Sequence, residues 1–182
     1  MSMAELQPLC KQTRLFVVMG VAGCGKSTIG ATLAKHLSGT YIDGDDFHPQ
    51  ANIDKMSKGE ALQDADRWPW LEIVAKELAN IKGLSFVGCS ALKKSYRDFI
   101  TQKAGEPVCF IYLDGSKELI ANRMAKREGH FMPTSLLDSQ FAALQVPSKD
   151  EHKIAIDISG SQESVIDKIV SRLNEPLSKE IL

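Results

Sequence analysis

The stretch Gly20-Val21-Ala22-Gly23-Cys24-Gly25-Lys26-Ser27 directly follows the apolar run Leu15-Phe16-Val17-Val18-Met19. Its spacing is G-x-x-x-x-G-K-[ST], in which the glycines let the backbone curl so that successive N–H groups point at an anion. After Lys26, apolar and small residues recur at helical spacing as far as Gly39, where a helix would stop. The start of that helix would present the positive end of its dipole to the same anion. A strand, this loop and a helix in succession predict an α/β fold that holds the phosphates of a nucleoside triphosphate.

The loop combines several kinds of phosphate ligand. Lys26 is expected to reach the outer phosphates and to act in catalysis, and Ser27 to offer its hydroxyl to a Mg²⁺ ion that bridges them. A glycine-rich turn that binds nothing is the alternative, and the strand before the loop and the helix after it argue against that alternative. The residues expected to contact the nucleotide are Gly20, Val21, Ala22, Gly23, Cys24, Gly25, Lys26, Ser27 and Thr28.

Composition bounds the class of protein. The chain has 182 residues, of which 43% are hydrophobic, and a formal net charge of −1. These values suit one globular domain and give no general attraction to nucleic acid or to anionic lipid. No apolar stretch approaches the roughly 20 residues that a membrane span needs, and the polar N-terminal segment lacks a signal-peptide pattern. We therefore expect a flexible leader over residues 1–13, a single domain over residues 14–182, and neither nucleic acid nor membrane as a partner.

The four cysteines lie far apart and include no C-x-x-C pair. This spacing indicates neither a zinc site nor a disulfide framework. Reduced thiols are typical of the cytosol, so a cytoplasmic location is expected. Cys89 and Cys109 fall in expected buried strands, where cysteine behaves as a small hydrophobic residue.

Strand and helix patterns alternate along the chain. Apolar runs predict five strands, near residues 14–19, 39–43, 84–89, 107–113 and 153–158. Helical spacing predicts helices near residues 26–38, 68–82, 91–103, 116–127, 134–144 and 161–174. This alternation predicts a five-stranded parallel sheet flanked by helices, with ligands bound beyond the carboxyl ends of the strands.

Acidic residues follow the second expected strand, in Asp43-Gly44-Asp45-Asp46. If the chain stays extended there, Asp43 and Asp45 project to the same side, about 7 Å apart. One carboxylate could then support magnesium while the other accepts the proton of an attacking hydroxyl, as phosphoryl transfer requires. An acidic, solvated turn is the alternative. His48, in the same loop, either binds substrate hydroxyls or is an ordinary loop histidine.

Basic residues near the second and third strands suit an anionic substrate. Arg67 either clamps a phosphate or carboxylate, or pairs with Asp64 or Asp66. Lys93 and Arg97 stand four residues apart. They are therefore expected to share one helix face and to grip an anion, with a merely solvated face as the alternative.

A second basic segment closes the helix expected near residues 116–127. Arg123 and Arg127 share a face there, and a turn that contains His130 follows. In a mobile lid over residues 123–133, these arginines would neutralise the charge that develops on a transferred phosphoryl group. The alternative is a helix C-terminus whose cations complement the helix dipole.

Taken together, these motifs resemble the gluconokinase family, and the resemblance runs from about Arg14 to the last expected helix. The blocks from Asp43 to Leu71 and from Cys89 to Asp98 are more specific than the phosphate loop. The segments that carry the resemblance are Gly20-Val21-Ala22-Gly23-Cys24-Gly25-Lys26-Ser27, Asp43-Gly44-Asp45, His48-Pro49, Asn52-Ile53-Asp54-Lys55-Met56, Gly59-Glu60, Leu62, Asp64, Asp66-Arg67, Pro69-Trp70-Leu71, Cys89-Ser90-Ala91-Leu92-Lys93-Lys94, Tyr96-Arg97-Asp98 and Gly129-His130-Phe131.

The resemblance implies transfer of the ATP γ-phosphate to the 6-hydroxyl of D-gluconate. It also implies a P-loop NTPase fold like that of nucleoside-monophosphate and shikimate kinases, in a cytosolic homodimer. Asp45 would accept or orient the hydroxyl proton, while Asp43 and Ser27 would hold magnesium. Lys26 and the lid arginines, Arg123 and Arg127, would stabilise the transferring phosphoryl group. The residues implied in substrate binding are Asp45, His48, Arg67, Lys93, Arg97 and His130, with Arg97 on the gluconate carboxylate beside Lys93 or Arg67.

Two other readings of the motifs stay open at this point. A kinase of similar shape could act on shikimate or adenylylsulfate, but the expected cleft is rich in charged groups rather than in stacking or apolar groups. A nucleotide-dependent switch would use the same phosphate loop, but it would not need a second pocket for an anion.

Overall fold

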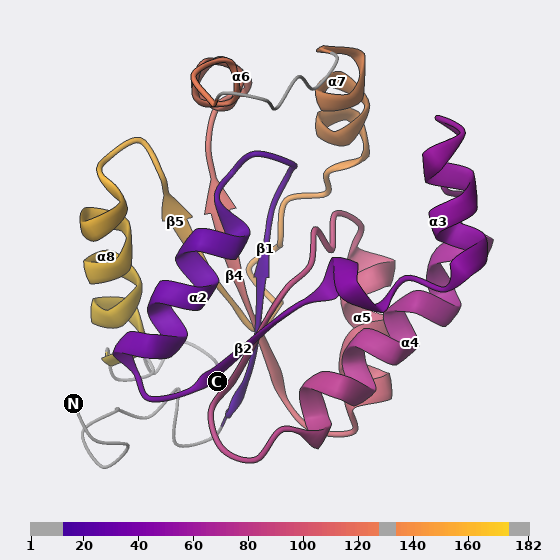
Figure 1. Ribbon diagram of the computed structural model, residues 1–182. Helices are drawn as coiled ribbons and strands as arrows, with labels where there is room; N and C mark the ends of the chain where they lie inside the picture. The colour runs from indigo at the N-terminus through magenta and orange to yellow at the C-terminus, as the bar shows by residue number, and fades with distance from the viewer. Residues whose placement is uncertain (1–12, 128–133, 175–182) are drawn as a thin grey trace.

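A computed structural model describes residues 13–127 and 134–174 of the chain. It shows a parallel sheet of five strands between two layers of helices (Figure 1). The sheet order is β2-β3-β1-β4-β5, and every neighbouring pair of strands is parallel. The strands are β1 (Leu15–Met19), β2 (Thr40–Asp43), β3 (Ser85–Gly88), β4 (Val108–Asp114) and β5 (Lys153–Asp157). The predicted α/β fold and its five strands are confirmed.

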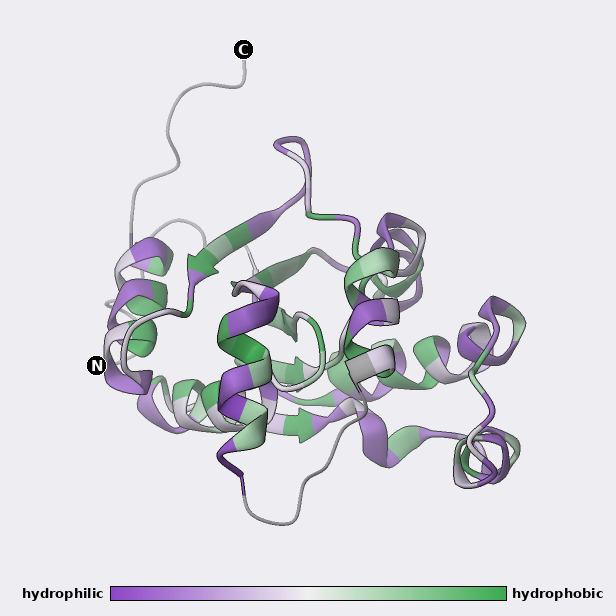
Figure 2. Ribbon diagram, turned by 90° about the horizontal axis from the view of Figure 1, so that it is seen from above, coloured by the Kyte–Doolittle hydropathy of each residue, from purple (hydrophilic) through white to green (hydrophobic). Residues whose placement is uncertain are grey.

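Strand β1 lies at the centre of the sheet and is buried on both faces. Its alternate side chains enter two separate core clusters, because successive residues of a strand point to opposite faces. Phe16 and Val18 pack with residues of α2 and α8, whereas Leu15, Val17 and Met19 pack with residues of α4 and α5. Hydropathy colouring shows the strands mostly green between helices of mixed colour (Figure 2).

The described helices are α2 (Lys26–His36), the 3₁₀ helix η2 (Gly44–Phe47), α3 (Gln50–Ser57), α4 (Asp64–Asn80), α5 (Lys94–Ala104), α6 (Lys117–Ala125), α7 (Thr134–Ala143) and α8 (Gln162–Asn174). Six of them lie near the six predicted helices, whereas η2 and α3 were not predicted. Helix α3 was missed because Asn52 is its one buried residue and it therefore has no apolar stripe.

Helix α4 begins at Asp64, earlier than the expected start near residue 68. Gln63 is the N-cap, and Asp66 is the third helical residue, whose carboxylate accepts a hydrogen bond from the Gln63 N–H at 2.8 Å. Asp66 therefore lies inside the helix, and its carboxylate completes a capping box. Pro69 lies inside the helix.

The chain is anchored from Thr13 onward. Thr13 was expected to belong to the flexible leader, but its side chain is buried. The guanidinium of the next residue, Arg14, donates to the carbonyls of Ile81 and Ala79 and pairs with Glu106 at 2.7 Å. The rest of the expected leader, residues 1–12, lies outside the described residues. None of the described helices has the length and apolar character to cross a membrane.

Candidate active site

The phosphate loop joins β1 to α2 at the carboxyl edge of the sheet, where the strands of Figure 1 point. The Lys26 Nζ atom lies over the loop, because it donates to the carbonyl oxygens of Gly20 at 3.1 Å and Val21 at 3.0 Å. Gly23 has φ +80°, and a Cβ atom there would lie 2.6 Å from the Sδ atom of Met124 on α6. A side chain at residue 23 would therefore strain the backbone and force the Met124 side chain to move.

Ser27 and Asp43 are brought together across α2 and β2. The Ser27 hydroxyl donates to Asp43 Oδ2 at 3.1 Å, and Asp43 Oδ1 accepts a hydrogen bond from the backbone N–H of Asp45 at 3.0 Å. Asp43 thus caps the helix η2, and the chain does not continue extended to Asp45. The extended chain on which the expected same-side spacing depended is therefore not formed, although both residues lie at the same edge of the sheet.

The Asp45 side chain is 85% exposed and faces the His48 ring. The His48 Nε2 atom lies 3.7 Å from Asp45 Oδ1, while the His48 side chain is only 7% exposed. The His48 ring lowers the pKa of the Asp45 carboxyl, so this carboxylate is ionised at neutral pH. His48 therefore stands behind Asp45, with little surface of its own available to a substrate.

A second polar cluster surrounds Asp64 at the start of α4. Lys93 Nζ lies 3.1 Å from both Asp64 carboxylate oxygens, and Arg67 Nη1 lies 3.8 Å from Asp64 Oδ1. The Tyr96 hydroxyl donates to Asp64 as well, and both cations lie over the Tyr96 ring. Hydrogen bonds from Tyr96 and then from Lys93 lower the pKa of Asp64. We call Asp64, Arg67, Lys93 and Tyr96 the Asp64 cluster.

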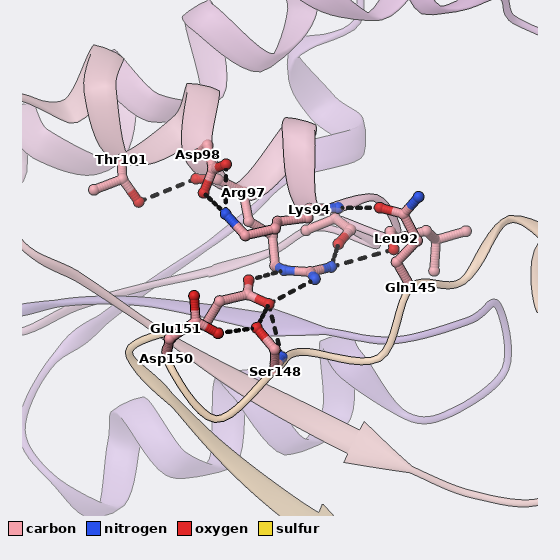
Figure 3. A network of polar contacts seen from close by, with 10 residues as sticks. Leu92, Lys94, Arg97, Asp98, Thr101, Gln145, Ser148, Asp150 and Glu151 are labelled. Carbon is pink, nitrogen blue, oxygen red and sulfur yellow. Dashed lines mark hydrogen bonds and ion pairs between the residues drawn. The ribbon is translucent and has the colours of Figure 1, made fainter.

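Arg97 does not join the Asp64 cluster, which corrects the expectation that it shares a face with Lys93. Lys93 is the N-cap of α5 rather than a helical residue, and the two side chains reach different partners. Arg97 is 1% exposed and pairs with Glu151 through Nε at 2.6 Å and Nη2 at 3.1 Å. Its remaining nitrogen donates to the carbonyls of Ala91 and Leu92 (Figure 3). Four of its five N–H donors are used in these contacts, and its burial leaves the guanidinium out of reach of a gluconate carboxylate.

The two arginines of the expected lid lie beside the phosphate loop. Arg123 Nη2 donates to the carbonyls of Ile158 at 2.6 Å and Gly160 at 3.1 Å, which ties α6 to the loop after β5. Arg123 and Arg127 line a cavity of about 340 Å³ together with Gly25 and other residues of the loop and of α2. His130 and the lid residues 128–133 lie outside the described residues.

Some residues of the site were missed by reasoning from the sequence. The Gln140 side chain of α7 accepts a hydrogen bond from the Ala22 N–H of the phosphate loop at 2.6 Å. Tyr96 belongs to the Asp64 cluster, and buried Asn52 contacts His48. Gln140 gave no signal because it lies 118 residues from its partner. Asn52 gave only a weak signal in the sequence, because its burial as the one buried residue of α3 becomes visible only in the structure.

Comparison with known proteins places this site in a family. A family model described as shikimate kinase matches residues 22–174. The chain is 51% identical to the thermosensitive gluconokinase of Escherichia coli over 148 residues, which cover 79% of each protein. It is 42% identical to the gluconokinase of Gluconobacter oxydans, over 86% of this chain and 89% of the relative.

A solved structure agrees with these matches. The crystal structure of a gluconokinase from Sinorhizobium meliloti superimposes with a TM-score of 0.80 at 41% identity, and covers 87% of this chain and 90% of that one. The structural likeness and the sequence identity extend well beyond the phosphate loop, which very many proteins share. The chain therefore belongs to the gluconokinase family, within the shikimate kinase-like P-loop kinases that use ATP.

Proposed function

We propose that this protein transfers the γ-phosphate of ATP to the 6-hydroxyl of D-gluconate and releases 6-phospho-D-gluconate and ADP. The observation that carries the proposal is the position of the Asp64 cluster and Asp45 at the carboxyl ends of β3 and β2, beside the phosphate loop after β1. The names of the relatives, each a gluconokinase, support the choice of acceptor.

The nucleotide side follows from the phosphate loop. Its backbone N–H groups, the N-terminus of α2 and Lys26 provide donors and positive charge for the triphosphate. The neighbouring cavity, lined by Thr28, Arg123 and Arg127, has the size and mixed lining to take the nucleoside. In phosphoryl transfer most of the rate gain comes from positioning and charge stabilisation, so Lys26 has the largest expected role.

Ser27 and Asp43 fit a magnesium ion. They bring a hydroxyl and a carboxylate oxygen within 3.1 Å of each other, and oxygen atoms are the ligands that Mg²⁺ prefers. Within the described residues, no group of three or more His, Cys, Asp or Glu side chains is placed to hold a metal alone. This suits an ion bound mainly by nucleotide phosphates and water. When bound, Mg²⁺ would neutralise charge on the phosphates.

The acceptor side has the charge that a sugar acid requires. Arg67 and Lys93 share the single carboxylate of Asp64, so the three groups carry a net positive charge for a second carboxylate. The exposed Asp45 can accept the proton of the attacking hydroxyl. As the new O–P bond forms, the hydroxyl proton passes to Asp45 and the bond between the γ-phosphorus and the ADP oxygen breaks. Arg67 and Lys93 replace Arg97 as the proposed carboxylate ligands.

A homodimer and a cytoplasmic location also remain proposals. Exposed Ile53 and Met56 on α3 support a protein contact there, and light scattering of the purified protein would measure the oligomeric state. The described cysteines, Cys24, Cys89 and Cys109, are buried thiols, which suits a reducing compartment.

The activity is tested by ADP release with Mg²⁺ and ATP in the presence of gluconate, idonate, shikimate, glycerate or no acceptor. Fast turnover with gluconate and not with shikimate or glycerate is the expected result. Lys26→Ala should abolish it, while Asp45→Asn should leave a slow residual rate. ATP hydrolysis that no acceptor stimulates would contradict the proposal.

A further inference from the structure

Asp45 is held from behind by a chain of buried contacts that begins in helix α4. We propose that Asn52 and His48 are positioning residues for Asp45, and that Asn52 fixes His48 in the tautomer that carries its proton on Nε2. This inference rests on the proposed function only in that Asp45 is taken to receive the hydroxyl proton. The arrangement itself follows from contacts between α3, α4 and the loop after β2.

The orientation of the Asn52 amide is settled by a backbone carbonyl. Buried Asn52 donates from Nδ2 to the carbonyl oxygen of Asp66 at 3.1 Å. A carbonyl oxygen accepts only from the amide nitrogen, so the two ends of the amide cannot be exchanged. The same nitrogen lies 3.3 Å from His48 Nδ1, and its second hydrogen is free to point there.

This contact decides where the proton of His48 sits. Because Asn52 Nδ2 is a donor, His48 Nδ1 must accept, and a neutral ring then carries its proton on Nε2. Nε2 is the atom 3.7 Å from Asp45 Oδ1. The ring donor therefore faces the carboxylate, and the separation can shorten to a hydrogen bond when substrates bind.

Trp70 contacts both the His48 ring and the backbone next to Asp45. The His48 ring stacks on Trp70 with centroids 4.2 Å apart and planes inclined by 16°. The Trp70 Nε1 atom donates to the carbonyl oxygen of Gly44 at 2.8 Å, which fixes the backbone immediately before Asp45. Asp45 is thus positioned through its backbone by Trp70 and through its carboxylate by His48. With Oδ1 facing His48, Oδ2 is left for the substrate hydroxyl.

The tautomer can be read directly by NMR. In the full chain labelled with ¹⁵N-histidine, His48 should show a protonated Nε2 and an unprotonated Nδ1, with its signals assigned by their loss in His48→Phe. Asn52→Asp replaces the donor by an acceptor and should protonate Nδ1. A protonated Nδ1 in the wild type, or an unchanged pattern in Asn52→Asp, would overturn the proposal.

A matched control lies on the same helix. Gln50 of α3 is exposed and donates to Asp54 at 2.8 Å without touching His48. Gln50→Ala should leave the His48 pattern as in the wild type. If Gln50→Ala changes the pattern as Asn52→Asp does, the effect belongs to the helix and not to Asn52, and the proposal fails.

Kinetics of two His48 variants give a test that does not depend on the folding of Asn52→Asp. His48→Phe keeps an aromatic ring on Trp70 but has no donor, whereas His48→Gln keeps an N–H donor and loses the ring. Positioning by Nε2 predicts that kcat falls about tenfold in His48→Phe with an unchanged KM for ATP, and recovers in His48→Gln. A purely structural role predicts the reverse order, which would overturn the proposal. A wild-type protein with no gluconate turnover but the expected tautomer would instead contradict the proposed function.

Discussion

Lys93 and Arg97 are one helical turn apart in the sequence, yet they belong to polar clusters with opposite properties. Arg97 and Glu151 are 1% and 9% exposed, and every guanidinium nitrogen has a partner within 3.2 Å. The side chains of Lys93 and Asp64 are 34% and 45% exposed. The Asp64 carboxylate contacts a lysine, an arginine and a tyrosine at the same time. A buried cation whose nitrogens all have partners within the protein stabilises the fold. An exposed cation that shares its counter-ion with another cation, as Lys93 does, can bind a ligand.

The buried cluster of Arg97 and Glu151 holds a loop against a helix. Glu151 Oε2 also accepts from the Ser148 N–H at 2.8 Å, and the Gln145 side chain accepts from the Lys94 N–H at 2.8 Å (Figure 3). These contacts fasten the loop between α7 and β5 to the first turn of α5. The Lys94 N–H is one of the donors that a helix start leaves without a partner, and Gln145 supplies it.

Arg97→Ala is expected to have the largest effect on stability, and it tests whether the buried cluster is structural and the Asp64 cluster binds the substrate. It leaves the Glu151 carboxylate buried without its partner, which should lower the free energy of unfolding by about 3–5 kcal/mol. Urea unfolding would measure the loss. The KM for gluconate of the folded protein should stay near the wild-type value, and a selective rise in that KM would return Arg97 to the substrate site.

Glu151→Gln should have the next largest effect, with a loss of about 1.5–3 kcal/mol at neutral pH. Burial alone would raise the pKa of Glu151, but hydrogen bonds from Arg97 and Ser148 outweigh it and the pKa is lowered. Stability from this group is therefore complete above the unfolded pKa of about 4.3 and is lost as the pH falls through the lower folded value. Wild type and variant should accordingly differ less in urea midpoint at pH 3 than at pH 7. An equal difference at both pH values would show that the pair is not ionic.

Lys93→Ala tests the Asp64 cluster. It should change the KM for gluconate rather than the stability of the fold. The KM for gluconate should rise about tenfold, which corresponds to about 1.4 kcal/mol, while the KM for ATP changes little. The loss of its exposed pair with Asp64 should cost less than about 1 kcal/mol of stability. Equal effects on both KM values would contradict a role in binding the acid.

Lys94→Ala is the matched control between these residues and should have the smallest effect. Its side chain pairs with Asp98 at 2.8 Å, but both groups are about half exposed. Solvent-exposed pairs of this kind, four residues apart on a helix, contribute little to stability. Urea unfolding and the KM for gluconate should both lie near the wild-type values. A rise in that KM as large as in Lys93→Ala would mean that general positive charge, rather than Lys93, attracts the acid.

The contrast also explains what the sequence could and could not predict. The phosphate loop was found because its ligands are neighbours in the chain, flanked by a buried strand and a helix with an apolar stripe. Arg97 was misjudged because its partner Glu151 lies 54 residues away, and helical spacing alone cannot show which neighbour a long side chain reaches. Asp43 and Asp45 were correctly expected at a strand end. The helix η2, which begins after Asp43 and contains Asp45, is capped by the Asp43 side chain, and the period-two pattern of a strand does not predict this cap.

Both tryptophans of the chain, Trp68 and Trp70, lie on α4 next to the proposed acceptor groups. Trp70 stacks on His48, and Trp68 meets the Tyr96 ring edge-on at 5.5 Å. The residues that line the cavity beside the phosphate loop include neither of them. The intrinsic tryptophan fluorescence of the protein therefore reports on the acceptor side of the site rather than on the nucleotide side. Gluconate can therefore be titrated into unlabelled protein by its effect on tryptophan emission, without a coupled assay. A nucleotide in the cavity beside the phosphate loop should change that emission less.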